Sequence, residues 1–448
     1  MPRTTPLYRW ALSLTRVLEP VAARWNGKAS SAVRGRTGVV ARFAAWGATC
    51  RDPSRPLLWM HAPSVGEGLQ AEAVLLEVRR QHPDWQIAFT HFSPSAVDLA
   101  KRIPAHISDF LPWDRQEDVA RSLDALRPSA IVFTKADLWP ELATQAAARG
   151  IKIGIVAATV GPGSSRLGWA ARTLLRAGYH TVSRAGAISA ADAERLARLG
   201  VPAGQIEVTG DPRFDSVLAK VSAVADDDAA LSFGRGAETL VAGSTWEEDE
   251  EVLFKAFAAV RTARPAIRLI VAPHEPTPAY LDALDRRAAA QGLPTPIRLS
   301  AATAPAPFLV VDRMGVLASL YGGATIAYVG GGFGKAGLHS VLEPAAWSVP
   351  VLFGPRWQQS REAGELLAAR AGAVVSPEFP DWLDLDPMAT YAGVSPLASL
   401  WLALLRNPGH ARAAGRRARE YVEAGAGAAA RNAGLVERLV EAGRISAR

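Results

Sequence analysis

Residues 57–81 have the sequence LLWMHAPSVGEGLQAEAVLLEVRRQ, and this stretch contains one complete strand-turn-helix unit. Its first five residues form a continuous apolar run, which is typical of a strand buried on both faces. Ser64 and Gly66 mark a turn, and apolar residues then recur at helical spacing as far as Gln81. A buried strand followed directly by a helix predicts a parallel α/β sheet.

The same alternation of apolar runs and helical patterns occurs in two sets along the chain. The first set covers strands predicted at 57–61, 86–90, 130–134 and 152–158, and the second begins after residue 236. We therefore predict an α/β protein with two Rossmann-like, doubly wound domains that face each other across a cleft. The predicted organisation is an amphipathic basic segment at 1–30, an N-terminal domain at 31–210, a C-terminal domain at 211–425, and a final helix at 426–448 for which packing on the N-terminal domain is one option.

Composition limits the class of protein. The chain has 448 residues, of which 49% are hydrophobic, and this is enough for two buried cores. A net charge of +7 suggests an anionic partner. Much of this charge comes from an excess of arginine, which is typical of a high-GC genome. Cys50 is the single cysteine, so disulfides are excluded, and we expect neither a metal site nor another cofactor. Nucleic acid is disfavoured because few aromatic residues alternate with the basic ones.

The N-terminal segment predicts an amphipathic helix over residues 7–25. Arg9 and Arg16 lie opposite the apolar face, and no acidic residue occurs between Glu19 and Arg51. Such a helix is suited to an anionic membrane surface, or it packs on its own domain with the basic face in solvent. The sequence leaves both options open. The apolar face comprises Leu7, Trp10, Leu14, Val17, Leu18, Val21 and Trp25.

Two motifs follow strands of the first set. Ser64, Gly66 and Glu67 open a helix after the first strand, where backbone N–H groups suit an anion or a sugar carboxylate. Glu67 is interpreted either as a helix cap or as a general base. Lys135 and Asp137 follow the strand at 130–134, so we expect them to face a substrate.

In the second set, His274 and Glu275 follow a strand and are flanked by prolines, which makes a core position improbable. A glycine-rich stretch at 330–337 follows a later strand and could let a ligand approach the backbone, or it could be purely structural. It matches neither a dinucleotide fingerprint nor a Walker A loop. Glu343, at the start of the next helix, is placed to accept hydroxyls of a ribose.

Together these motifs resemble the 3-deoxy-D-manno-octulosonic acid (Kdo) transferase family, from about Trp59 to Ser376. The motifs are HAPSVGEG, FSPS, DLWPEL, AERLARLG, VTGDPRFDS, AGSTWEEDEE, PVLFGP and the long segment from Asp312 to Trp347. The resemblance implies an inverting GT-B glycosyltransferase at the cytoplasmic face of the bacterial inner membrane. Its donor would be CMP-Kdo and its acceptor a lipid A precursor. The implied CMP-binding residues are His274, Glu275, Met314, Gly315, Val316, Ser340, Val341, Leu342 and Glu343, and the implied substrate residues are Ser64, Gly66, Lys135 and Asp137.

The chain departs from the family at its catalytic base. The resemblance places this glutamate near 38–40, where no acidic residue occurs, and the family's Met-Gly-Glu is Met314-Gly315-Val316 here. We therefore assign the base to Glu67, and another acidic residue in this role stays open. Two alternatives stay open: a catalytically degenerate protein that binds a nucleotide sugar, and a GT-B transferase that uses another nucleotide-sugar donor.

Overall fold

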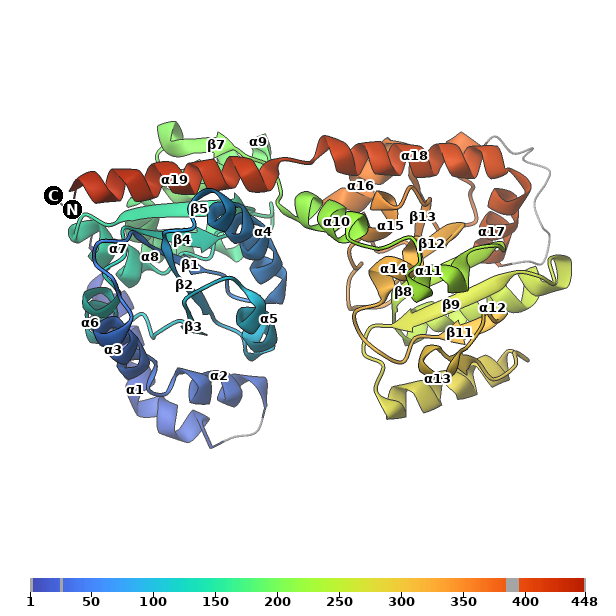
Figure 1. Cartoon of the computed structure of the whole chain (residues 1–448), viewed down its shortest axis with the longest axis horizontal. Coiled ribbons are helices and arrows are strands. Elements are labelled where there is room, and N and C mark those ends of the chain that lie inside the picture. Colours follow the sequence, from blue (N-terminus) through green and yellow to red (C-terminus); the bar gives the residue numbers. More distant parts are fainter. Residues whose placement is uncertain (1–2, 25–26, 384–394, 447–448) are drawn as a thin grey trace. The chain divides into compact units, whose positions relative to one another are not determined.

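The computed structural model describes residues 3–24, 27–383 and 395–446. The chain forms two compact units. Unit 1 consists of Met1–Ser216 together with Gly425–Arg448, and unit 2 consists of Val217–Ala424. Each unit contains one seven-stranded sheet whose neighbouring strands are all parallel (Figure 1).

The sheet of unit 1 has the strand order β3-β2-β1-β4-β5-β6-β7. Successive side chains of a strand point to opposite faces of the sheet. Alternate residues of the central strands are therefore buried in two different cores, one on each face. Leu57 and Trp59 pack with helices α3, α6 and α7, whereas Leu58 and Met60 pack with α4, α5 and α19. The elements of unit 1 are α1 (Pro6–Ala22), α2 (Lys28–Arg36), α3 (Val39–Thr49), β1 (Leu57–His61), α4 (Val65–Gln81), β2 (Gln86–His91), α5 (Val97–Arg102), β3 (Ile107–Phe110), α6 (Gln116–Leu126), β4 (Ala130–Thr134), α7 (Pro140–Ala148), β5 (Lys152–Ala158), α8 (Trp169–Tyr179), β6 (Val182–Ala187), α9 (Ala190–Leu199), β7 (Ile206–Val208), the start of α10 (Arg213–Ser222) and α19 (Ala428–Ser446).

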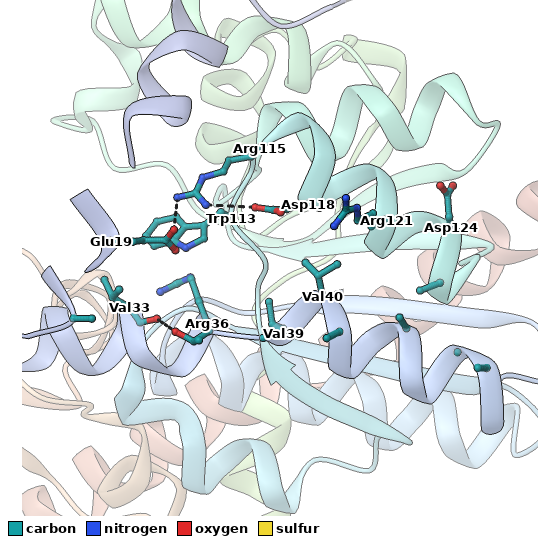
Figure 2. A pocket seen from close by; sticks show the side chains of 18 of the residues that line it. Glu19, Val33, Arg36, Val39, Val40, Trp113, Arg115, Asp118, Arg121 and Asp124 are labelled. Atoms are coloured by element: carbon teal, nitrogen blue, oxygen red, sulfur yellow. Dashed lines mark hydrogen bonds and ion pairs between the residues drawn. The ribbon is translucent and has the colours of Figure 1, made fainter. Parts of the chain in front are cut away.

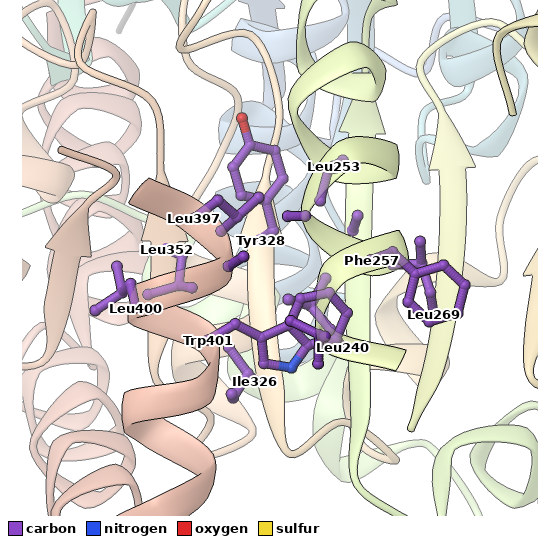
Figure 3. Close-up of a cluster of buried hydrophobic side chains, with 14 of the residues drawn as sticks. Leu240, Leu253, Phe257, Leu269, Ile326, Tyr328, Leu352, Leu397, Leu400 and Trp401 are labelled. Carbon is purple, nitrogen blue, oxygen red and sulfur yellow. The ribbon is translucent and has the colours of Figure 1, made fainter. Parts of the chain in front are cut away.

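The sheet of unit 2 has the strand order β10-β11-β9-β8-β12-β13-β14. Figure 3 shows the core on one of its faces, where Trp401 of α17 and Phe257 of α12 stack at a ring distance of 6.1 Å over Leu240 and Ile326. The remaining elements are α11 (Ala229–Gly234), β8 (Thr239–Thr245), α12 (Glu247–Ala263), β9 (Arg268–Pro273), α13 (Pro278–Ala290), β10 (Ile297–Arg298), β11 (Phe308–Val310), α14 (Leu317–Tyr321), β12 (Ile326–Val329), α15 (Leu342–Ala346), β13 (Val351–Phe353), α16 (Arg361–Ala368), β14 (Gly372–Val374), α17 (Pro396–Arg406) and α18 (Pro408–Ala424).

The two doubly wound sheets confirm the predicted fold class. All the strands predicted from apolar runs are present, whereas β3, β6, β7 and β10 were not predicted. These strands are short or carry polar residues such as Arg184 in β6, so they lack a continuous apolar run. That the two domains face each other across a cleft stays a prediction.

The last helix, α19, belongs to unit 1 and packs on β4, β5, β6 and α4 (Figure 1). Its buried Asn432 accepts hydrogen bonds from the Ala157 amide at 3.3 Å and the Thr209 hydroxyl at 3.0 Å. Ala157 has a φ of 50°, a strained value for alanine, and the Asn432 carbonyl holds its amide in place. A tail segment distant in sequence therefore completes unit 1.

Helix α1 packs on unit 1 through polar side chains. The Tyr8 hydroxyl donates to Asp114 at 2.7 Å, and Arg9 pairs with the buried Glu141 at 3.0 Å. The apolar residues Leu7, Trp10 and Leu14 are instead 63%, 63% and 43% exposed. The option of an apolar face packed on its own domain is therefore wrong for these three residues. Trp25 and the side chains of Val17, Leu18 and Val21 lie outside the described residues.

Among the described residues, no helix combines the length and the apolar character that crossing a membrane requires.

Candidate functional site

Each sheet has one point where the strand order reverses direction, and the predicted motifs lie at these points. In unit 1 the reversal falls between β1 and β4, and in unit 2 it falls between β8 and β12. Ligands of open α/β sheets bind beyond the carboxyl ends of the strands at such a point, where loops diverge to opposite faces. Ser64, Glu67 and Lys135 follow β1 and β4, and Trp246 and Gly330 follow β8 and β12.

In unit 1, three predicted residues meet in one cluster. Glu67 accepts hydrogen bonds from both the Lys135 ammonium and the Ser64 hydroxyl. The Ser64 side chain makes no cap to the backbone of α4, whereas Glu67 lies in the first turn of this helix, so both interpretations of Glu67 stay predictions. Burial raises the pKa of Glu67, but its bonds to Lys135 and Ser64 more than offset this and leave the pKa below its usual value. Glu67 is therefore a carboxylate at neutral pH.

Asp137, which also follows β4, pairs with other residues. Arg166 Nη2 lies 2.7 Å from one oxygen of Asp137, and Nε2 of the fully buried His61 lies 3.7 Å from the other. Burial acts to raise the pKa of Asp137, and His61 and Arg166 together bring it below the usual value. Asp137 is thus a second ionised carboxylate at this edge of the sheet. A Cβ added at Gly66 would meet no atom within 4 Å, so this glycine borders open space.

In unit 2, three aromatic rings form a cluster that joins the ends of three neighbouring strands. Trp246 follows β8, His274 follows β9, and His339 lies in the loop after β12. The Trp246 ring stacks on His274 at 4.7 Å, and the two imidazoles lie 4.5 Å apart. Trp246 Nε1 donates a hydrogen bond to His339 Nε2 at 3.1 Å. Burial, with a contribution from His274, lowers the pKa of His339 to about 4, so His339 is neutral at pH 7.

Asp249 connects this ring cluster to the glycine-rich loop. Its carboxylate accepts from the Trp246 amide at 3.0 Å, the Gly331 amide at 2.7 Å and the Tyr328 hydroxyl at 2.7 Å. A Cβ at Gly330 would lie 2.3 Å from the Ser244 carbonyl oxygen, so the loop needs glycine for its own packing. The interpretation of the glycine-rich stretch as purely structural therefore accounts for Gly330.

The predicted residues Glu275, Met314, Gly315 and Val316 lie beyond the carboxyl ends of β9 and β11. Glu275 is exposed, and Met314 is 73% exposed. Gly315 has a φ of 90°, a backbone conformation that favours glycine. Val316 precedes the first turn of α14. Of these four residues, none belongs to the ring cluster.

The predicted segment 340–343 follows the ring cluster directly. Ser340 is exposed, whereas the side chains of Val341 and Leu342 are buried in the core, so only their backbone could reach a ligand. Helix α15 begins at Leu342, so Glu343 lies in its first turn. Glu343 is half-buried and pairs with Lys220 at 3.2 Å.

Unit 1 also contains a cavity of about 950 Å³ between α2, α3 and α6 (Figure 2). Small apolar residues, most of them from α3, line it together with charged groups, most of them from α6 and the residues beside it. Figure 2 shows Arg115 between Glu19 and Asp118, at 2.8 Å and 3.6 Å respectively. Burial raises the pKa of Asp118. The cavity is also lined by Gly38, Val39 and Val40, so acidic side chains lie beside the acid-free segment where the resemblance places the base.

Arg36, on the wall of the same cavity, is only 3% exposed. It stacks on Phe92 at 3.8 Å and donates to the carbonyls of Leu111 and Ala32. Burial lowers its pKa to about 10. A buried guanidinium held mainly by carbonyl oxygens keeps its charge available to an anion.

Sequence reasoning missed His61, Arg166, Glu19, Arg36 and Trp246 as site residues. His61 and Trp246 lie inside motifs that were identified, and their position at a strand end was the available signal. Glu19 and Arg36 gave no local signal, since their partners are distant in sequence.

Two units with parallel sheets, each bearing polar or aromatic side chains at its reversal point, define a GT-B fold. Solved structures share this fold. UDP-GlcNAc 2-epimerase from Neisseria meningitidis bound to UDP-GlcNAc matches 80% of this chain and 94% of its own, at 12% identity and a TM-score of 0.56. Anabaena Alr3699/HepE in complex with UDP matches 86% and 99%, at 14% identity and a TM-score of 0.53.

Residues 33–216 match the family described as 3-Deoxy-D-manno-octulosonic-acid transferase (kdotransferase). The 3-deoxy-D-manno-octulosonic acid transferase of Haemophilus influenzae is 26% identical over 76% of this chain and 81% of its own. The enzyme of the same name from Bordetella pertussis is 26% identical over 89% and 90%, and that of Chlamydophila psittaci is 29% identical over 71% and 74%. The chain is thus similar to this family of glycosyltransferases over most of its length.

Proposed function

We propose that the protein transfers Kdo from CMP-Kdo to a lipid A precursor in lipopolysaccharide biosynthesis. Similarity to transferases of this family over most of the chain carries this proposal. The polar clusters at the reversal points of both sheets support it, since each is placed where a GT-B domain would bind one substrate.

In the proposed reaction, an acceptor hydroxyl oxygen forms a bond to the anomeric carbon of Kdo while the bond to the CMP phosphate breaks. The hydroxyl proton must leave as this bond forms, so a base is required. We assign this role to Glu67, because Lys135 and Ser64 keep its carboxylate ionised. Ser64, Gly66, Lys135 and Asp137 would hold the acceptor. The reaction requires no cofactor.

The donor is assigned to unit 2. His274 and Glu275, the segment 314–316 and the segment 340–343 follow strands of one sheet edge and would surround the CMP group. Neutral His339 and the backbone around Gly315 supply hydrogen-bond donors without a fixed charge.

The acceptor is a phosphorylated lipid, and unit 1 has surfaces that suit one. The 950 Å³ cavity combines small apolar lining residues with Arg36 and Arg115. On α1, exposed Leu7, Trp10 and Leu14 would enter the surface of the cytoplasmic leaflet of the inner membrane, because the opposite side of this helix is bound to unit 1. Flotation with anionic vesicles tests this: L7S/W10S/L14S should reduce binding, whereas L76S, at a Leu that is 56% exposed elsewhere, should not.

A CMP-release assay with CMP-Kdo and tetraacylated lipid A precursor tests the activity. We expect E67Q to lower turnover by at least about 100-fold, the usual contribution of a general base, with CMP affinity unchanged. The matched control is E72Q on the same helix, which should keep wild-type turnover. If E67Q keeps turnover while E19Q or D118N loses it, the base lies in the cavity instead. Absence of CMP release by the wild type, with CMP still bound, would establish the degenerate binding protein; release from a UDP-sugar would establish another donor.

A further inference from the structure

A second cavity of unit 1, of about 670 Å³, lies on the edge of the sheet opposite to Glu67 and Lys135. Its lining segments immediately precede β1, β4 and β5, so it sits at the amino ends of these strands. Since β1 is five residues long, the two edges are separated by roughly 15 Å. The cavity is distinct from every site described above, although Arg127 also borders the cavity in Figure 2.

Five arginines line this cavity, which we call the arginine cavity. Among the described residues, no aspartate or glutamate lines it. The arginines come from four separate segments of the chain: Arg51 and Arg55 from the first, and Arg127, Arg149 and Arg444 from one each. Arg149 has a carboxylate partner, Asp124, at 3.5 Å. The side chains of Arg127 and Arg444 make no hydrogen bond or ion pair with any residue that the structure describes. Five positive charges are thus concentrated here, and those of Arg127 and Arg444 have no acidic partner among the described residues.

Part of this arrangement has a structural explanation. Helices α3, α6, α7 and α19 all end at this edge, and arginines stabilise the partial negative charge of helix carboxyl ends. Arg51 does so by donating to the carbonyls of Leu126 at 2.8 Å and Arg127 at 3.1 Å. Burial, together with the charges of Arg127 and Arg55, lowers the pKa of Arg51, so the repulsion persists after capping. Capping explains Arg51 but not the guanidinium groups of Arg127 and Arg444.

We propose that the arginine cavity binds a phosphate group, with Arg127 and Arg444 as its principal donors. A guanidinium presents N–H groups in a planar fork that matches phosphate oxygens, and the bound charge would relieve the repulsion around Arg51. The volume exceeds that of a bare phosphate ion, so a phosphate carried on a larger molecule fits. Such a phosphate could belong to a soluble molecule or to an anionic lipid headgroup. This site is independent of the proposed transferase reaction.

The test compares R127Q/R444Q with R102Q, which removes an exposed arginine of unit 1 that does not line the cavity. Calorimetry with inorganic pyrophosphate examines the soluble source. Flotation with phosphatidylglycerol vesicles, with phosphatidylcholine vesicles as reference and all proteins carrying L7S/W10S/L14S, examines the headgroup. Arg51 is left intact because it caps α6.

We expect R127Q/R444Q to weaken one of these interactions by about tenfold or more, since bonds from charged donors to phosphate are stronger than neutral ones. R102Q should leave both interactions unchanged. Loss of pyrophosphate binding identifies a soluble phosphate, and loss of flotation identifies a headgroup. Wild-type behaviour of the double variant in both arms overturns the proposal, as does an equal loss with R102Q, which would indicate nonspecific charge attraction. Circular dichroism confirms that each variant is folded.

Discussion

The hydrogen bond between Trp246 and His339 determines where the imidazole carries its proton. An indole N–H can only donate, so His339 Nε2 must accept through its lone pair at 3.1 Å. A neutral imidazole that accepts at Nε2 carries its hydrogen on Nδ1. Cδ2, which is bonded to Nε2, lies 3.4 Å from the position that a Cβ of Gly331 would occupy, so Nδ1 is on the other side of the ring from these contacts. His339 thus keeps Nδ1–H as a donor for a bound ligand.

The substitution W246F removes the N–H group and keeps an aromatic ring beside His274, 4.7 Å from the indole in the wild type. One hydrogen bond contributes about 0.5–1.5 kcal/mol to the neutral form of His339. Because one pKa unit corresponds to about 1.4 kcal/mol, its loss should raise the pKa of His339 by about 0.4–1.1 units. Starting from a pKa of about 4, the variant should titrate near pH 5.

Long-range ¹H–¹⁵N NMR spectra of labelled histidines measure both the tautomer and the pKa. We expect the Nδ1–H form in the wild type and a mixture of tautomers in W246F, with H339Q to assign the signal. W169F changes a tryptophan that is 83% exposed and should leave the His339 signal unchanged. A pKa unaltered by W246F, or an Nε2–H tautomer in the wild type, would refute the reasoning.

The same pKa has a consequence for acid stability. The pKa of His339 in the fold lies below its unfolded value of about 6.5, so the unfolded chain binds more protons between about pH 4 and 6.5. The contribution of His339 to stability is therefore lost as the pH falls through this range. In W246F this loss should be smaller, and urea unfolding at pH 4.5 and 7.5 measures the difference.

Three other substitutions probe the packing around the sites. N432A leaves the buried Ala157 amide and Thr209 hydroxyl without their acceptor. It should lower the free energy of unfolding, measured by urea titration, by about 2–4 kcal/mol. A change below about 0.5 kcal/mol would contradict the role of α19. G330A places a Cβ 2.3 Å from the Ser244 carbonyl oxygen and should lower the melting temperature, whereas G409A, with no atom within 4 Å, should not; equal melting temperatures would count against the tight loop. E141A removes the partner of Arg9 and Thr4. It should speed amide hydrogen exchange in α1 while exchange in β1 stays slow. Unchanged exchange in α1 would show that other contacts hold this helix.

Local patterns in the sequence were enough to predict the class of fold. Buried parallel strands such as 57–61 and 130–134 are continuous apolar runs, and such runs are visible without any knowledge of their neighbours. The same property placed Glu67 and Lys135 at strand ends. Short strands with a polar face, such as β3, have no comparable signal, and they were missed for that reason.

Which side chains meet was decided only by the tertiary structure. Lys135 reaches Glu67 because β4 lies beside β1, and Trp246 reaches His339 because β12 lies beside β8. Likewise, Glu19 reaches Arg115 only when α1 packs on unit 1 through its polar side. Periodicity in a sequence reports the environment of each segment, but it does not state the order in which segments pair. The order of the strands depends on how much apolar surface the layers of helices and sheet bury against one another. The geometry of the Glu67–Lys135 cluster and of the ring cluster depends on that order.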